Sequence, residues 1–289
     1  MNASDFEEIV YDIEGHVATI TLYRPEKMNA QTRRMTEEIN AALDLAAADE
    51  QVRAVIFTGA GRAFCAGSDM SAGPSSAPAE GGAPPPPNTR TSNVTLNLFD
   101  FPKPVIAAVN GAAVGFGASS LLAMDIRICS TMGRFGFVYA KRGIPPESAA
   151  SWFLPRIVGV ERALTWLYTG RVFGAQEALE AGLVSEVVEP DALLDRAMEI
   201  AKEIAETSAP VTVAFTRQAV WKGLTMPHPR DAWLAESDLT RTLRGSPDSR
   251  EGVASFLEQR APNFVGKASD IPAESWPKGM PPLRPFPEA

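Results

Sequence analysis

Residues 104–117 read PVIAAVNGAAVGFG and combine an apolar run with a turn that holds three glycines. The run at 104–109 is apolar and partly β-branched, which is typical of a strand inside a core. The turn at 110–117 follows it, and where a helix begins such a turn presents backbone N–H groups without an internal partner. The start of a helix also carries about half a positive charge. This stretch therefore predicts a place where developing negative charge is stabilised.

Two strand–helix–strand units are predicted around this stretch. The first has strands at 17–22 and 53–58. Between them, apolar residues recur at helical spacing: Met35, Ile39, Leu43 and Ala46. The second unit has strands at 104–109 and 126–130 with a short helix at 117–124. Short strands that alternate with helices predict an α/β layered core.

A second glycine-containing turn, residues 64–70 (FCAGSDM), follows the first unit. Both turns are also compatible with a purely steric role, because glycine turns after strands are common. The turn at 110–117 contains GxxxGxG rather than the dinucleotide fingerprint GxGxxG, and the sequence contains no P-loop motif. Nucleotide cofactors of those two kinds are therefore disfavoured.

Composition excludes several classes of protein. The 289 residues are 45% hydrophobic and 21% charged, which is sufficient for a substantial core. A net charge of −8 without a long basic run disfavours nucleic acid as a partner. The polar, acidic start and the lack of 18 consecutive apolar residues disfavour secretion and membrane spanning. The two cysteines, Cys65 and Cys129, lack disulfide or metal spacing, so we expect reduced thiols and a cytoplasmic location.

Three parts are expected along the chain. Residues 1–200 form the core, with a Pro/Gly-rich insertion at 71–90; residues 201–267 form a helical C-terminal region; residues 268–289 form a proline-rich extension. The insertion is either a surface loop or a flap over a substrate channel, because long loops in compact domains often act as lids. Helices are expected near 161–169, 175–181, 191–207, 210–221, 230–243 and 248–260.

Several motifs, in a fixed order, resemble the crotonase superfamily, which includes the enoyl-CoA hydratases and isomerases. They include ITLYRPEKMNA at 20–30, FCAGSDM at 64–70, PVIAAVNGAAVGFG at 104–117 and FLPRIVG at 153–159. The resemblance spans residues 5–267. It implies an α/β fold, the ClpP/crotonase-like spiral of ββα units, followed by a helical region that assembles trimers, often paired into hexamers. It also implies an acyl-CoA thioester as the partner, with no metal and no cofactor apart from the CoA of the substrate.

The resemblance further implies an oxyanion hole made of two backbone amides. Motif matching assigns these amides to Ser68 and Phe116, which bind the thioester carbonyl. The family usually has glycine at the second position. If that position needs an unusual backbone angle, the phenylalanine adds strain of about 1–3 kcal/mol. We expect its ring to line the acyl pocket.

A carboxylate is the expected proton carrier, because the sequence has only two histidines, His16 and His228. The two glutamates of the family's hydratases correspond here to Ser119 and Tyr139, so hydration by a glutamate pair is in doubt. Glu147 matches instead the place where some crotonases carry a catalytic acid. Its alternative role is to cap a helix that begins near Ser148. Tyr139 either orients water or substrate or is a core residue.

The resemblance also implies residues that bind CoA. Backbone around Lys27 to Ala30, including Met28, and around Ala63 to Ala66 is expected to hold the adenine. Basic residues expected near the phosphates are Arg24, Lys27 and Lys267; Lys267 and Phe264 are expected to reach a ligand in a neighbouring subunit. The remaining predicted contacts are Asp69, which in the family supports its loop or lies near CoA, and Gly115.

Other functions remain open at this stage. The leading prediction is an enoyl-CoA hydratase or isomerase, with isomerisation favoured because a single carboxylate is sufficient for a 1,3-proton shift. A hydrolase of thioester or C–C bonds, or a dehalogenase, is an alternative in which an acid at Glu147 attacks carbon or activates water. A relative that binds acyl-CoA without catalysis is the non-enzymatic alternative. Asp69 and Asp125 are weaker candidates for proton transfer than Glu147.

Overall fold

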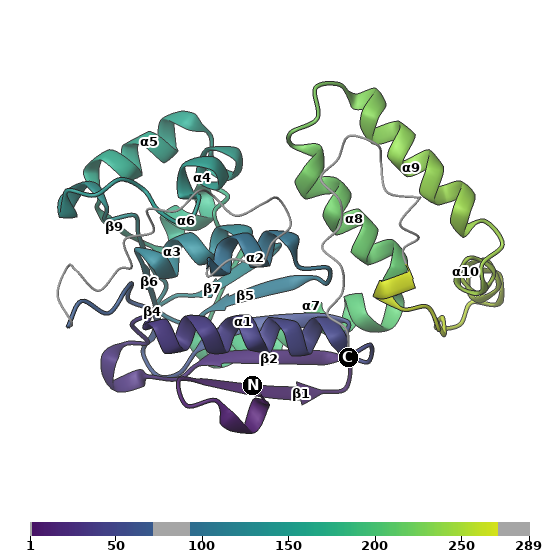
Figure 1. Ribbon diagram of the computed structural model, residues 1–289, viewed down its shortest axis with the longest axis horizontal. Helices are drawn as coiled ribbons and strands as arrows, with labels where there is room; N and C mark the ends of the chain where they lie inside the picture. The colour runs from purple at the N-terminus through teal and green to yellow at the C-terminus, as the bar shows by residue number, and fades with distance from the viewer. Residues whose placement is uncertain (1, 72–92, 271–289) are drawn as a thin grey trace.

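The computed structural model describes residues 2–71 and 93–270 (Figure 1). Most of the Pro/Gly-rich insertion predicted at 71–90, and the proline-rich extension beyond residue 270, lie outside the described residues. The role of the insertion as a flap therefore stays a prediction.

The larger sheet has the strand order β1-β2-β3-β5-β7-β10. Its strands are β1 (Ile9–Glu14), β2 (Val17–Leu22), β3 (Ala54–Gly59), β5 (Val105–Val109), β7 (Ile126–Ser130) and β10 (Glu186–Val188). β1 pairs antiparallel with β2, and the other pairs are parallel. Every residue of β3 and β5 is buried, and accordingly β5 is apolar throughout and β3 is apolar from Ala54 to Phe57. The four strands predicted from the sequence are confirmed.

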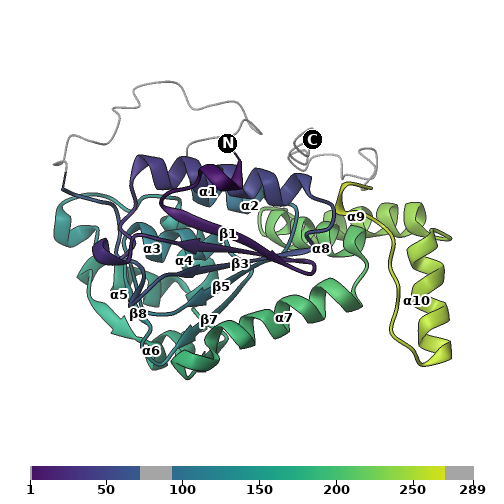
Figure 2. The same ribbon diagram turned by 90° about the horizontal axis from the view of Figure 1, so that it is seen from below.

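Helices cover both faces of this sheet (Figure 2). On one face lies α1 (Arg33–Ala48), whose predicted stripe, from Met35 through Ile39 and Leu43 to Ala46, is buried. The Thr32 hydroxyl caps its first turn by accepting from the Met35 amide at 3.0 Å. On the other face, α7 (Leu193–Thr207) buries a stripe of its own against the sheet. The boundary expected at residue 200 falls inside α7.

A second, smaller sheet has the order β4-β6-β8-β9. Its strands are β4 (Ala63–Cys65), β6 (Ala112–Val114), β8 (Arg134–Gly136) and β9 (Val172–Gly174). Along the chain, β3, β5 and β7 of the larger sheet are each followed by one strand of the smaller sheet. The result is a strand pair that recurs three times, with a helix after each pair, and this arrangement confirms the predicted α/β layering.

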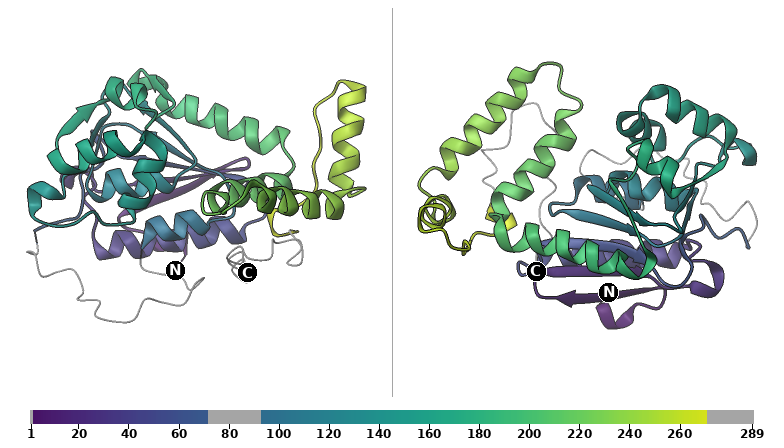
Figure 3. Two further views of the ribbon diagram at one scale, coloured as in Figure 1. Left: turned by 90° about the horizontal axis from the view of Figure 1, so that it is seen from above. Right: turned by 180° about the vertical axis from the view of Figure 1, so that it is seen from behind.

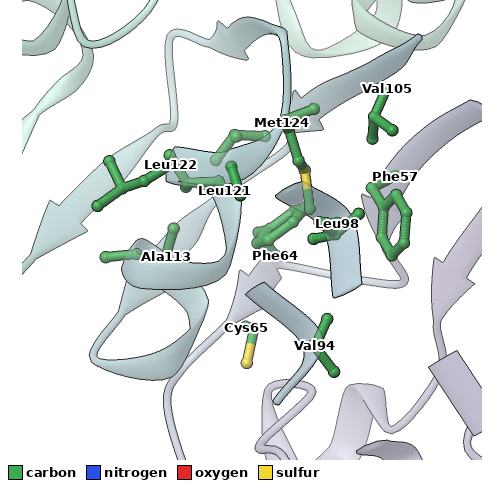
Figure 4. Packing of buried hydrophobic residues seen from close by; sticks show 14 of the residues in the cluster. Phe57, Phe64, Cys65, Val94, Leu98, Val105, Ala113, Leu121, Leu122 and Met124 are labelled. Carbon is green, nitrogen blue, oxygen red and sulfur yellow. The ribbon is translucent and has the colours of Figure 1, made fainter. Parts of the chain in front are cut away.

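The core fills the space between the two sheets and the short helices around them (Figure 4). These helices are α2 (Val94–Asp100), α3 (Phe116–Ser120), α4 (Ala150–Val158), α5 (Val160–Thr169) and α6 (Ala175–Glu180). Figure 4 shows Phe64, Leu98 and Met124 converging in this space, with Cys65 and Ala113 on the strands beside it. The core thus supports the two strands, β4 and β6, that end in the glycine turns.

The C-terminal helices project from this core (Figures 1 and 3). They are α8 (Pro210–Gly223), α9 (Pro229–Leu243) and α10 (Pro247–Glu258), as the sequence predicted. Arg217 fixes α8 to the core: its guanidinium is buried and donates to the Asp125 carboxylate at 2.8 Å and to the Leu98 carbonyl at 2.7 Å. It also donates to the Phe99 carbonyl at 3.2 Å; because the last carbonyls of a helix have no partner within the helix, this arginine caps the end of α2.

Candidate functional site

The two glycine turns meet at one edge of the smaller sheet. β4 and β6 are parallel neighbours, so their carboxyl ends lie side by side. A Cβ added to Gly115 would lie 3.7 Å from the Gly67 Cα. Gly67 has φ 107° and Gly115 has φ 55° with ψ −119°, conformations that favour glycine. Two turns separated by almost fifty residues in sequence are therefore in contact.

The start of α3 lies against the backbone of β4. A Cβ on Gly117 would lie 2.2 Å from the Cys65 carbonyl oxygen, which leaves no space for any side chain. This close approach fixes the position of the Phe116 amide relative to the turn that holds Ser68.

Neither predicted oxyanion amide is used inside the described part of the chain. The Gln31 amide donates to the Gly67 carbonyl at 2.8 Å, and the Asp69 amide donates to the Gln31 carbonyl at 2.8 Å. In this parallel bridge the N–H of Ser68 points away from Gln31. Phe116 is the first residue of α3, where an amide has no partner within the helix. Both amides can therefore donate to a ligand.

Phe116 needs no unusual backbone angle, so the condition for strain at this residue is not met. Phe116 begins α3, and the unusual angles belong to Gly115, which precedes it. Because glycine occupies the demanding position, a phenylalanine is accommodated one residue later. Its side chain is buried in the main core.

The loop expected to hold adenine lies beside the Ser68 turn. The Ala66 amide donates to the Met28 carbonyl at 3.0 Å. Met28 and Asn29 both have left-handed backbone, with φ 52° and 55°. The fully buried Asn29 side chain donates to the Ala63 carbonyl at 2.7 Å and accepts from the Arg24 amide at 2.8 Å. The structural role of the Asn29 side chain was not predicted from the sequence, although an asparagine within a tight turn is a signal for left-handed backbone.

Arg24, which was predicted to lie near the CoA phosphates, forms ion pairs and a hydrogen bond within the protein. Its guanidinium forms ion pairs with Glu8 at 3.3 Å and Asp69 at 3.1 Å and donates to the Ala30 carbonyl at 2.6 Å. Hydrogen bonds from Ser71 and from Arg24 lower the pKa of Asp69 to about 2. These contacts tie the loop at residues 24–30 to the Ser68 turn. Lys27, in the same loop, is exposed.

Phe264 and Lys267 lie at the opposite end of α1 from Ser68. Lys267 forms an ion pair with Glu50, which follows α1, whereas the Ser68 turn pairs with Gln31, which precedes it. At 1.5 Å per residue, a helix of 16 residues is about 24 Å long. Within one chain, Phe264 and Lys267 are therefore far from Ser68.

The two residues at the hydratase glutamate positions are in contact with each other. The hydroxyls of Ser119 and Tyr139 form a hydrogen bond, and both residues are buried. Burial raises the pKa of Tyr139 to about 12; the bond to Ser119 opposes this effect and the negative charge of Glu147 adds to it.

Glu147 lies in a strained turn before α4. The pKa of its carboxyl is raised because the group is partly shielded from water, although the residue has an exposed surface. Ser148 and Ala149 follow with φ 53° and 55°, so the helix begins at Ala150 rather than near Ser148. The Ala150 amide donates to the Glu147 carbonyl at 3.0 Å. In the described residues the Glu147 side chain makes no capping bond, so capping does not explain it.

The contacts of Asp125 indicate a structural role. Its carboxylate accepts from Val105 and Arg217, each at 2.8 Å, and from the Trp221 indole at 2.6 Å. Across residues 2–71 and 93–270, no cluster of His, Cys, Asp and Glu side chains has the arrangement of a metal site. No helix within those ranges has the length and apolar character needed to cross a membrane.

Known proteins resemble this chain over most of its length. The family model described as Enoyl-CoA hydratase/isomerase matches residues 12–267. The chain is 38% identical to (E)-benzylidenesuccinyl-CoA hydratase of Thauera aromatica, over 89% of this chain and 99% of that protein. It is 35% identical to 1,2-epoxyphenylacetyl-CoA isomerase of Escherichia coli, over 90% and 99%.

A solved structure shows the same fold. The crystal structure of enoyl-CoA hydratase from Bacillus anthracis has a TM-score of 0.80 and 32% identity, covering 90% of this chain and all of that one. This likeness confirms the predicted crotonase-type spiral of ββα units. The chain therefore belongs to the enoyl-CoA hydratase/isomerase family of enzymes.

Proposed function

We propose that the protein acts on an enoyl-CoA thioester, with the backbone amides of Ser68 and Phe116 as an oxyanion hole and Glu147 as the proton-transfer carboxylate. The observation that carries this proposal is the contact between the Gly67 and Gly115 turns, each followed directly by an amide that is free to donate.

The amides act on charge that develops during the reaction. Removal of a proton from C2 of the acyl group places negative charge on the thioester oxygen. Two preset donors stabilise that state more than they stabilise the neutral carbonyl, and each is worth roughly 3 kcal/mol. Membership of a family with hydratases and isomerases supports this chemistry.

Isomerisation is the reaction that this site favours. Tyr139, with a pKa of about 12, stays protonated near neutral pH, and Ser119 has no carboxylate, so neither replaces a glutamate base. Glu147 is thus the carboxylate of the proposed site. It takes the proton from C2 of a 3-enoyl-CoA and returns it to C4 on the same face, which forms the 2-enoyl-CoA. No cofactor takes part beyond the CoA of the substrate.

Glu147→Gln tests this proposal. We expect kcat for conversion of 3-enoyl-CoA to 2-enoyl-CoA to fall by about 10²-fold or more, since general acid–base catalysis contributes about 10²–10⁴-fold. KM should change little. The matched control is Glu189→Gln at an exposed position, which should retain full activity. Full activity of Glu147→Gln would reject the proposed role.

The same assay separates the alternatives. Hydration of crotonyl-CoA at a rate above that of isomerisation would make the protein a hydratase. Accumulation of a covalent acyl or aryl intermediate would support the hydrolase or dehalogenase alternative. Tight binding of acyl-CoA esters without turnover would identify a binding protein.

For CoA itself, we propose that the backbone of the loop around Met28 and Ala30 and of Ala66 holds the adenine, with Lys27 near the phosphates. Asp69 and Gly115 then hold the turns in place. Phe264 and Lys267 reach the CoA of a neighbouring subunit, because they lie far from Ser68 in their own chain. This arrangement requires a homotrimer, or a hexamer made of two trimers, in the cytoplasm.

A further inference from the structure

Gln31 contacts the Ser68 turn at three points. Its amide donates to the Gly67 carbonyl at 2.8 Å, and its carbonyl accepts from the Asp69 amide at 2.8 Å. Its side chain makes the third contact, because the Ser68 hydroxyl donates to the Gln31 Oε1 atom at 3.2 Å. Of these contacts, only the third depends on which side chain residue 31 carries.

The two backbone bonds aim the Ser68 amide but leave it free to tilt. In a trans peptide the C=O and the N–H point in opposite directions, so the Ser68 N–H points away from Gln31, which holds the Gly67 carbonyl. Two contacts define a line, and the turn can rotate about that line. The side-chain bond of Ser68 lies off the line and opposes this rotation. Because an N–H···O bond weakens steeply below about 120°, the tilt of the amide decides how well it binds a thioester oxygen.

The Gln31 side chain is itself held by α1. The Thr36 hydroxyl donates its hydrogen to the Thr32 carbonyl at 2.9 Å, and a hydroxyl has only one hydrogen to donate. Towards Gln31 it therefore accepts, from the Nε2 atom at 2.8 Å. This contact turns the Oε1 atom of the amide group, which can only accept, towards the Ser68 hydroxyl. A directed chain of three hydrogen bonds thus connects the Ser68 turn to α1.

We propose that Gln31 is a positioning residue for the oxyanion hole: its side chain holds the Ser68 turn at the tilt in which the Ser68 amide faces the thioester oxygen. This inference rests on the proposed function, because it takes that amide to be a donor to the oxygen. Gln31 does not touch the reacting atoms. Its effect therefore falls on the state in which the oxygen carries negative charge, where the direction of the donor matters most.

Gln31→Met tests the inference, because methionine has a side chain of similar length without the amide group. The backbone contacts of residue 31 remain. We expect kcat for conversion of 3-enoyl-CoA to 2-enoyl-CoA to fall by about 3- to 10-fold, the range that one hydrogen bond supplies, with KM nearly unchanged. Ser68→Ala removes the same bond and keeps the amide, so it should lose a similar factor. The double variant should lose no more than either single variant.

A second measurement separates positioning from a general structural role. Acetoacetyl-CoA is acidic at C2 and its enolate absorbs in the near ultraviolet, so the absorbance of the bound ester reports how strongly the protein favours the charged oxygen. The parent protein should favour the enolate more than water does. Gln31→Met should reduce this preference by about 3- to 10-fold, while binding of butyryl-CoA, whose carbonyl stays neutral, should change by less than about twofold.

Two further variants complete the design. Thr36→Val removes the acceptor that holds the Gln31 side chain and should also lower kcat and the enolate preference. Gln51→Met, at an exposed glutamine, should change neither. An enolate preference that Gln31→Met leaves intact, or an equal loss of enolate preference and butyryl-CoA binding, overturns the inference. A parent protein that does not favour the bound enolate overturns the proposed oxyanion hole as well.

Discussion

Glu147 differs from an ordinary surface glutamate in its environment. Its carboxyl is partly desolvated, and this raises its pKa. A group that must be ionised to accept a proton loses activity as the pH falls through its pKa. We therefore predict that kcat/KM falls on the acidic side at a pH above the ordinary pKa of glutamate, with no alkaline loss from Tyr139 until about pH 12.

Rates from about pH 4 to about pH 9 test this prediction. An acidic limb at or below the ordinary glutamate pKa would contradict it.

The raised pKa of Glu147 also has a consequence for the stability of the fold. Because the folded-state pKa is raised, the contribution of Glu147 is present at low pH and is lost as the pH rises through that pKa. Glu147→Gln should remove this component from the pH dependence of unfolding.

Ala149 has a left-handed backbone, which is unusual for alanine. Its φ is 55°, directly after the similar Ser148, and one such residue costs about 1–2 kcal/mol. Ala149→Gly should therefore raise the free energy of unfolding by about 0.5–1 kcal/mol, measured with denaturant, because glycine adopts this angle without strain. We expect activity to fall, because Glu147 would be held less rigidly.

Ala150→Gly is the matched control, since Ala150 is helical. There, glycine should lower the free energy of unfolding by about 0.5–1 kcal/mol. Equal effects at positions 149 and 150 would show that the strain at Ala149 has no energetic consequence.

At the scale of elements, the contact between α3 and β4 determines where the Phe116 amide lies. Gly117→Ala places a Cβ 2.2 Å from the Cys65 carbonyl oxygen, so one of the two backbones must move. We predict a loss of about 1–3 kcal/mol in unfolding free energy. A fall in kcat for enoyl-CoA isomerisation should accompany it, because the two turns move apart.

Gly223→Ala provides the comparison. Gly223 ends α8 with no atom within 4 Å of an added Cβ, and alanine favours a helix by about 0.8–1 kcal/mol over glycine. Its stability should rise slightly and its activity should not change. A Gly117→Ala protein with native stability and activity would contradict the proposed importance of the contact.

At the scale of the whole molecule, the C-terminal helices carry exposed apolar side chains. On α10, Val253, Phe256 and Leu257 are 61%, 81% and 73% exposed in the single chain. Soluble monomers rarely present contiguous apolar patches of this kind. We expect these residues to be buried between subunits of the proposed trimer.

Leu257→Asp should therefore reduce the assembly to monomers in sedimentation equilibrium, because a charge would be buried at the interface. Ile13→Asp, at an exposed position of β1, should leave the assembly unchanged. A protein that sediments as a monomer before any substitution would refute the proposed trimer, and with it the shared CoA site.

The long elements of this protein were predictable from its sequence. β2 and β7 have the predicted bounds, and the apolar stripe of α1 is buried as predicted. The motifs were also sufficient to indicate the family, because they occur in order along most of the chain. Periodicity over many residues is a local property, so it can be recognised in the sequence before the fold is known.

Tertiary structure alone decided the rest. The strands β4, β6 and β8 have three residues each, too few for a pattern, and they form only because β3, β5 and β7 place them side by side. Arg24 is engaged by Glu8 and Asp69, a contact between residues far apart in sequence. The bond between Ser119 and Tyr139 likewise depends on two separate units coming together. Such contacts form only in the packed chain, because the two partners are far apart in sequence and folding brings them together.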